Sequence, residues 1–128
     1  MKTSKAVYDS RFFVESFYSN DDSTLRRIRQ HKVLERYISA VVLHEVYRLA
    51  LSREGREVAK IKVANIKKSF KVADVDDEIA QLSAEFRHQY QLPMGDSMIA
   101  ATASLLSAVC VTDDPHFKQI KEIQTQWI

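Results

Sequence analysis

Short apolar runs alternate with longer segments of helical periodicity along this 128-residue chain. Short runs bounded by polar residues are typical of buried strands, whereas apolar residues spaced three and four apart predict amphipathic helices. The segments that predict strands are KAVY at 5–8, RYISA at 36–40, KVADV at 71–75, AVCVT at 108–112 and a tail near 123–127. The segments that predict helices are 10–18, 22–31, 41–53, 56–69, 76–90 and 96–107.

Capping and breaking residues separate several of these segments. Asp22 and Ser23 can cap the second helix, and Gly55 is the break between the third and the fourth. Pro93 and Gly95 predict a turn before the last helix. Strands that alternate with helices predict an α/β domain in which a parallel sheet of about 4–5 strands carries helices on both faces. The length of the chain fits one such domain over residues 1–128.

Composition adds little to this picture until the placement of charge is considered. Hydrophobic residues make up 45% of the chain, which is enough for a core, and the net charge of +2 is too small to identify a partner. Residues 58–73 nevertheless hold five lysines and no acid. Such a stripe suits a phosphate backbone, although a solvated helix face is the commoner explanation.

Cysteine usage and hydropathy indicate the compartment. Cys110 is the single cysteine and lies in an apolar run, so an internal disulfide is impossible and a buried thiol is expected. No apolar run approaches the ~18 residues needed to span a bilayer. We therefore expect a soluble, cytoplasmic protein with no membrane partner.

Several common classes of site are excluded by the residues themselves. The chain has only two glycines, so it cannot form the glycine-rich loop of a P-loop or of a dinucleotide fold. In HEVYR at 44–48, Arg48 stands where a zinc-protease helix needs its second histidine. The four histidines show no zinc spacing, and a serine triad lacks a nucleophile elbow.

Four carboxylates adjoin apolar runs, where a charge is costly unless it is paired or bound to a metal. They are Asp9, Glu45, Asp96 and Asp114. Asp9 and Asp114 follow predicted strands, and parallel sheets collect their ligands at the carboxyl ends of strands. Four such groups at one place would attract a hard cation such as Mg²⁺ or Mn²⁺. This arrangement favours metal-assisted phosphodiester hydrolysis, which needs no nucleophilic side chain.

Helix capping is the competing explanation for three of the four acids. Asp9 and Asp96 each stand at the start of a predicted helix, and Asp114 is followed by a proline, as an N-cap often is. Glu45 does not fit that explanation, because it lies in the middle of a helix on a face shared with Val42 and Leu49. A buried glutamate is rare unless it is paired.

Four motifs in order resemble the PIN-domain family, and specifically the VapC-type toxin ribonucleases of toxin–antitoxin pairs. The motifs are VYDSRFF, SAVVLHEV, LPMGDSMIAATA and VTDDPHF, and together they extend over essentially the whole chain. The resemblance implies that Asp9, Glu45, Asp96 and Asp114 are the catalytic metal ligands. It also implies supporting roles for Ser10, Thr112 and Asp113. Asp113 adjoins Asp114, which the Thr-x-Asp spacing of the family identifies as the ligand. Arg11 departs from the small polar residue of many relatives, which would alter the pocket rim or form an ion pair.

The resemblance further implies a three-layer α/β/α sandwich around a twisted parallel sheet. The activity it implies is Mg²⁺- or Mn²⁺-dependent endonucleolytic cleavage of RNA. The partners it implies are an RNA substrate, a VapB-like antitoxin and a second copy of the chain in a homodimer.

Two other functions remain open at this point. One is a PIN-like scaffold that binds RNA or a protein without cutting it, although the complete set of acids argues against a degenerate site. The other is a phospho-receiver domain, which has a similar length and strand-end aspartates but requires an acidic pair after the first strand and a lysine after the last. His116 is expected to be a partly exposed packing residue, for which a phosphate contact is also conceivable.

Overall fold

Five strands and six α-helices alternate through residues 4–128, which are the part of the chain that the computed structural model describes. The strands are β1 (Lys5–Tyr8), β2 (Glu35–Ser39), β3 (Lys71–Ala73), β4 (Val109–Val111) and β5 (Thr125–Gln126). The helices are α1 (Ser10–Tyr18), α2 (Asp22–Gln30), α3 (Ala40–Glu54), α4 (Arg56–Ser69), α5 (Asp77–Tyr90), α6 (Met94–Leu106) and the 3₁₀ helix η1 (Pro115–Gln119).

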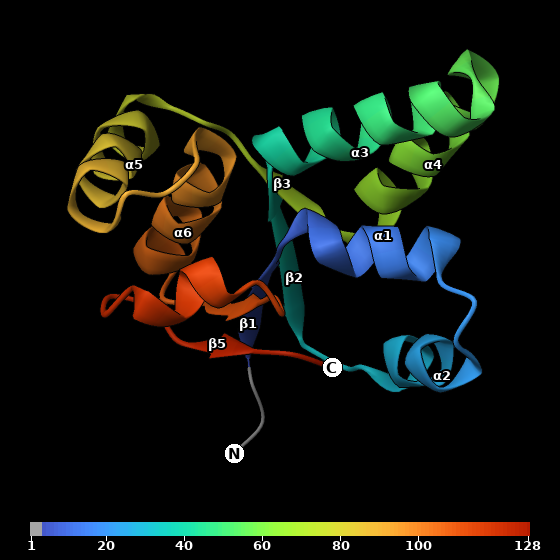
Figure 1. The fold of residues 1–128 in the computed structure, drawn as a ribbon, viewed down its shortest axis with the longest axis horizontal. Coiled ribbons are helices and arrows are strands. Elements are labelled where there is room, and N and C mark those ends of the chain that lie inside the picture. Colours follow the sequence, from blue (N-terminus) through green and yellow to red (C-terminus); the bar gives the residue numbers. More distant parts are fainter. Residues whose placement is uncertain (1–3) are drawn as a thin grey trace.

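The strands form one parallel sheet in the order β3-β2-β1-β4-β5. Strand β1 is central, and its last residue Tyr8 pairs with Val111, the last residue of β4. Figure 1 shows α5 and α6 on one side of the strands and α1, α3 and α4 on the other. The predicted α/β fold with a parallel sheet between helices is thereby confirmed.

The order of the strands also excludes the phospho-receiver alternative. Receiver domains have the flavodoxin-like order 2-1-3-4-5, in which the third strand lies beside the first. Here β3 lies at the sheet edge beyond β2, and β4 takes the place beside β1. The carboxyl ends of β1 and β4 therefore lie next to each other at the reversal of strand order, where parallel sheets bind ligands.

The core lies along β1 and against the small residues of α6. Tyr8 is fully buried, although it is large and carries a hydroxyl group. Ala100, Ala101 and Ala103 of α6 are buried as well, and their short side chains let the helix approach the sheet closely. Cys110 is free and buried, as predicted. No helix within residues 4–128 combines the length and the apolar character needed to cross a membrane.

Two predicted boundaries are wrong in an informative way. Helix α2 is capped by Asp21 and not by Asp22 or Ser23, because the Asp21 carboxylate accepts a hydrogen bond from the Ser23 amide at 3.3 Å. The predicted turn at Pro93–Gly95 is instead the start of α6, with Pro93 as its N-cap. Proline at a helix start leaves no backbone donor unsatisfied, so it marks a beginning as readily as a break.

Gly55 separates α3 from α4 with φ 88° and ψ 174°, a conformation that L-residues avoid. A Cβ atom added there would meet nothing within 4 Å, so a substitution affects only the backbone. We expect Gly55→Ala to destabilise the protein by about 1–3 kcal/mol, and so to lower Tm by at least about 4 °C. Thermal unfolding followed by circular dichroism measures the change. Lys60→Ala, at an exposed position of α4, is the control and should leave Tm nearly unchanged. Equal Tm values for Gly55→Ala and the wild type would contradict this account of the junction.

Candidate metal centre

Asp9 stands directly after β1 and is fixed there by its backbone and by two hydroxyl groups. Its amide donates a hydrogen bond to the Val111 carbonyl of β4 at 3.1 Å. Thr112 Oγ1 donates to Asp9 Oδ2 at 2.7 Å, and Ser10 Oγ donates to Oδ1 at 3.3 Å. The Asp9 carboxylate makes no helix-capping hydrogen bond to α1, so the capping explanation is wrong for this residue.

Asp114 is held by the chain that follows β4. Its amide donates to Thr112 Oγ1 at 3.0 Å, so a single threonine hydroxyl contacts both strand-end aspartates. Asp114 Oδ1 accepts from the His116 amide at 2.9 Å and thereby caps η1. The capping explanation is therefore correct for Asp114. The hydrogen bond to η1 fixes the orientation of its carboxylate, and Asp114 still lies near Asp9.

Asp96 reaches the same place from the first turn of α6. It is not the cap of that helix, since the N-cap position is Pro93. His116 Nδ1 lies 3.3 Å from Asp96 Oδ2 and 3.3 Å from Asp114 Oδ1. One ligand atom from each of these three residues lies within 4.8 Å of the other two, which is close enough to surround one ion.

Glu45 approaches from α3 and has an unsatisfied oxygen. Its Oε1 is buried and has no hydrogen-bond partner among the described residues. A Cβ atom on Gly95 would lie 3.4 Å from Glu45 Oε2, so the glycine lets the glutamate and the start of α6 meet closely. Burial, assisted by the negative charges of Asp9 and Asp96, raises the pKa of Glu45 to about 7.

The four predicted acids act on one another electrostatically. Burial raises the pKa of Asp9, and the charges of Asp96 and Asp114 raise it further. Burial likewise raises the pKa of Asp96, with the charge of Asp114 as the next cause. The tight three-residue set includes Asp96 and Asp114 but not Asp9 or Glu45, which interact with these acids through their charges.

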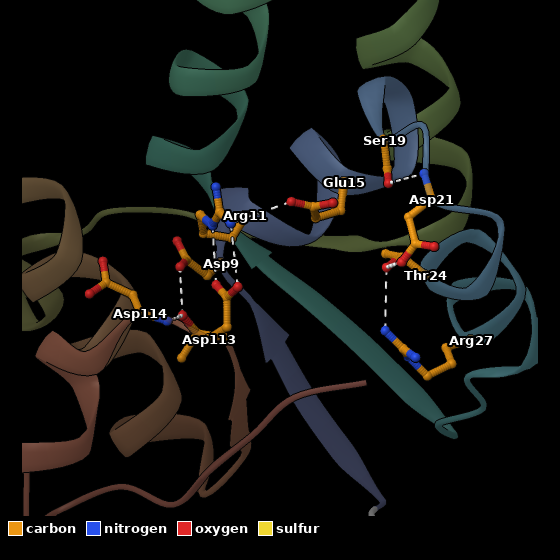
Figure 2. Close-up of polar contacts among 10 residues, drawn as sticks. Asp9, Arg11, Glu15, Ser19, Asp21, Thr24, Arg27, Asp113 and Asp114 are labelled. Atoms are coloured by element: carbon orange, nitrogen blue, oxygen red, sulfur yellow. Dashed lines mark hydrogen bonds and ion pairs between the residues drawn. The ribbon is translucent and has the colours of Figure 1, made fainter.

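Asp113 is directed away from this group. Arg11 Nε donates to Asp113 Oδ1 at 3.1 Å and Arg11 Nη2 donates to Oδ2 at 3.3 Å, so both carboxylate oxygens are engaged. The guanidinium also contacts Glu15 at 3.4 Å. Figure 2 shows the carboxylates of Asp113 and Asp114 pointing in different directions, the first toward Arg11. Arg11 therefore forms an ion pair, which is one of the two outcomes expected for this residue from the sequence.

These donors fit a hard divalent cation. All four acids offer oxygen, the type of ligand that Mg²⁺ and Mn²⁺ prefer. The buried Glu45 oxygen lacks a partner, and buried polar atoms without partners are uncommon in folded proteins. Burial first, and then the charges of neighbouring acids, raises the pKa values of Asp9, Glu45 and Asp96, and a bound cation would oppose both effects.

Sequence reasoning missed His116, which it assigned to packing. The side chain is 54% exposed and faces Asp96 and Asp114. A signal was present in the order Asp-Pro-His, because an aspartate cap followed by proline starts a helical turn that folds the next residues back over the cap. His116 can therefore add a nitrogen ligand to the oxygen set.

Comparisons with known proteins identify the family and the fold. The model of the PIN domain family matches residues 6–123. The structure is similar to that of VapBC2 from Rickettsia felis bound to a DNA fragment from their promoter (TM-score 0.78, 17% identity, covering 97% of this chain and 98% of that one). It is also similar to DNA-bound VapBC from Salmonella typhimurium (TM-score 0.79, 20% identity, 97% and 98% covered).

A third similar structure is VapC20 from Mycobacterium tuberculosis, described as a Sarcin-Ricin loop cleaving toxin (TM-score 0.76, 17% identity, 93% and 98% covered). At these identities the likeness to solved structures establishes the fold alone. No curated protein matches the chain by sequence.

The raised pKa of Glu45 predicts a pH-dependent cost of the charged site. Between the ordinary glutamate pKa and about 7, the native state binds more protons than the unfolded state, so stability falls as pH rises. In EDTA at about pH 8, Glu45→Gln should raise Tm by about 4 °C, the change that on the order of 1 kcal/mol produces. At about pH 5 the gain should nearly vanish, because Glu45 is then neutral.

Thermal unfolding at the two pH values measures this effect. Glu85→Gln is the matched control, because Glu85 is exposed on α5. Its substitution should leave Tm nearly unchanged at both pH values. A Glu45→Gln variant with the same Tm difference at both pH values would show that the charge of Glu45 carries no such cost.

Proposed function

The chain belongs to the PIN-domain family, and from this we propose that it is a Mg²⁺- or Mn²⁺-dependent endoribonuclease. The observation that supports the activity is the convergence of carboxylates from two neighbouring strand ends and two helices, with a buried Glu45 oxygen that has no partner. The substrate class in this proposal is RNA, and the bond hydrolysed is a phosphodiester.

Asp9, Glu45, Asp96 and Asp114 are the proposed ligands. A bound ion supplies Lewis-acid polarisation of the phosphate and lowers the pKa of an attacking water. The hydroxyl of Thr112 contributes by holding the carboxylate of Asp9 and the backbone of Asp114 in one relative position.

Supporting residues limit how the ligands can move. Ser10 donates to the second oxygen of Asp9, so that carboxylate keeps its orientation before an ion binds. Arg11 neutralises Asp113 and so prevents a fifth acid from adding to the repulsion. These contacts prepare the oxygen ligands in advance, which reduces the cost of ordering them on binding.

The biological role that we propose is that of the toxin in a VapBC-type pair. The similar structures from Rickettsia felis and Salmonella typhimurium are VapBC assemblies, and VapC20 is described as cleaving the Sarcin-Ricin loop. On this proposal the protein works in the cytoplasm as a homodimer, and a VapB-like antitoxin covers the four carboxylates.

Cleavage of a labelled single-stranded RNA by the purified protein tests the activity. We expect internal cuts with Mg²⁺ or Mn²⁺ and none with EDTA. A protein that binds RNA but does not cut it with either metal would favour the scaffold alternative.

Asp96→Asn should lower cleavage by at least about 100-fold, because the amide keeps the shape but loses the charge that holds the ion. Asp113→Asn is the matched control, since Asp113 is paired with Arg11 and should retain most activity. Initial rates of RNA cleavage at saturating Mn²⁺ measure both. Retained activity in Asp96→Asn with normal metal dependence would contradict the four-carboxylate site.

Metal binding should also be visible without RNA. An ion that binds only the native state stabilises it by about 2.7 kcal/mol at 100 times its dissociation constant, so Mn²⁺ should raise Tm by several degrees. The gain should be much smaller in Asp96→Asn and normal in Asp113→Asn. Thermal unfolding across a Mn²⁺ titration provides the measurement. A chain with no shift in any variant would not be a metal-dependent nuclease of this design.

A further inference from the structure

A cavity of about 600 Å³ opens beside the acidic group, and of the four proposed ligands only Glu45 lines it. It lies between α1 and α3 and reaches Gly95 at the start of α6. Glu45 and Ser10 belong both to the wall of this cavity and to the surroundings of Asp9. The cavity is therefore continuous with the metal centre.

One face of α3 forms most of the wall. Val41, Glu45, Arg48, Leu49 and Ser52 all line the cavity. Glu45 follows Val41 by four residues, Arg48 and Leu49 follow Glu45 by three and four, and Ser52 follows Leu49 by three, which places them along one side of the helix. The wall therefore carries a carboxylate and a cation side by side, Glu45 and Arg48, flanked by the apolar side chains of Val41 and Leu49.

Arg48 is the cation next to Glu45 on this wall. The two residues are three apart on the helix, where side chains are neighbours. Arg48 is exposed, and among residues 4–128 its guanidinium has no ion pair or side-chain hydrogen bond. Arg11 differs, because its guanidinium is already engaged by Asp113 and Glu15. Arg48 thus has an uncommitted planar donor array of the kind that binds phosphate in two-point contacts.

The chemistry of an RNA strand fits the acidic group, the arginine and the apolar side chains of this cavity. Its phosphates recur once per nucleotide, so a strand with one phosphate at the acidic group must place its neighbour a short distance along the surface. An acidic group repels a polyanion, and a nearby free arginine supplies the opposite charge. Val14 of α1 lines the same cavity as Val41 and Leu49 of α3, and these three side chains offer apolar contact for a base.

We propose that this cavity is a nucleotide-binding subsite, in which Arg48 contacts the phosphate next to the one that is cut and the apolar side chains that flank Glu45 and Arg48 contact a base. The proposal rests on the ribonuclease function proposed above and adds the way in which the strand is positioned. Arg48 is in this view a positioning residue that touches the substrate strand away from the reacting bond.

Binding of a fluorescein-labelled single-stranded RNA of mixed sequence, followed by anisotropy in EDTA, tests the subsite without cleavage. Arg48→Gln should weaken binding about 5- to 10-fold. It should also reduce the slope of log affinity against log salt by about 0.7, the value for one phosphate contact on a single strand. Arg87→Gln, an exposed arginine on α5, is the matched control and should change neither quantity.

A second variant tests the apolar wall independently of charge. Val14→Phe fills the cavity from α1 and should weaken RNA binding while leaving the salt slope unchanged.

In cleavage assays with Mn²⁺, Arg48→Gln should raise KM several-fold with little change in kcat, because it removes binding shared by the ground state and the transition state.

The outcomes separate the two proposals. Normal affinity and an unchanged salt slope in Arg48→Gln, together with metal-dependent cleavage by the wild type, would overturn the subsite and leave the nuclease intact. Arg48→Gln that binds RNA normally but loses affinity for a co-purified partner protein would assign the cavity to a protein instead, and would also overturn it. A wild-type protein that neither binds nor cuts RNA would overturn both.

Discussion

The organisation of the site follows from the cost of holding like charges together where water is scarce. Burial and the charges of its neighbours raise the pKa of Glu45 to about 7, which shows that this cost is only partly compensated. Asp9 represents the compensated end of the range, because two hydroxyl groups donate to its oxygens. Glu45 Oε1 represents the other end, with no partner within the described chain. A framework that satisfies some carboxylates and leaves another unsatisfied is suited to a cation, since the ion supplies the missing charge.

Topology makes this concentration of charge possible. Asp9 and Thr112 are 103 residues apart in sequence, yet they form a 2.7 Å hydrogen bond because β1 and β4 are parallel neighbours that end together. Helices α3 and α6 then contact each other above these strand ends and bring in Glu45 and Asp96. Gly95 lies at that contact, where a Cβ atom would lie 3.4 Å from Glu45 Oε2, at van der Waals distance from the carboxylate. The sheet therefore fixes two of the four carboxylates directly and positions the other two through the packing of helices on it.

Much of this arrangement could be predicted from the sequence, because strand and helix periodicity are local signals. The α/β alternation and the inward-facing position of Glu45 follow from apolar spacing alone. The start of α6 could not be predicted in the same way, because Pro93 and Gly95 are equally compatible with a turn, and only the contact with Glu45 distinguishes the two. The place of His116 was missed for a similar reason, since its neighbours Asp96 and Asp114 come from different parts of the chain.

The neighbouring acids at 113 and 114 show how local geometry divides two identical side chains between different tasks. Asp114 turns toward η1 and caps it, so its oxygen is held next to Asp96. Asp113 is directed to the other side, where Arg11 engages both of its oxygens. Without that arginine a further negative charge would add to the repulsion that already raises the neighbouring pKa values. Arg11 and Asp113 therefore compensate for each other's charge across the rim of the site.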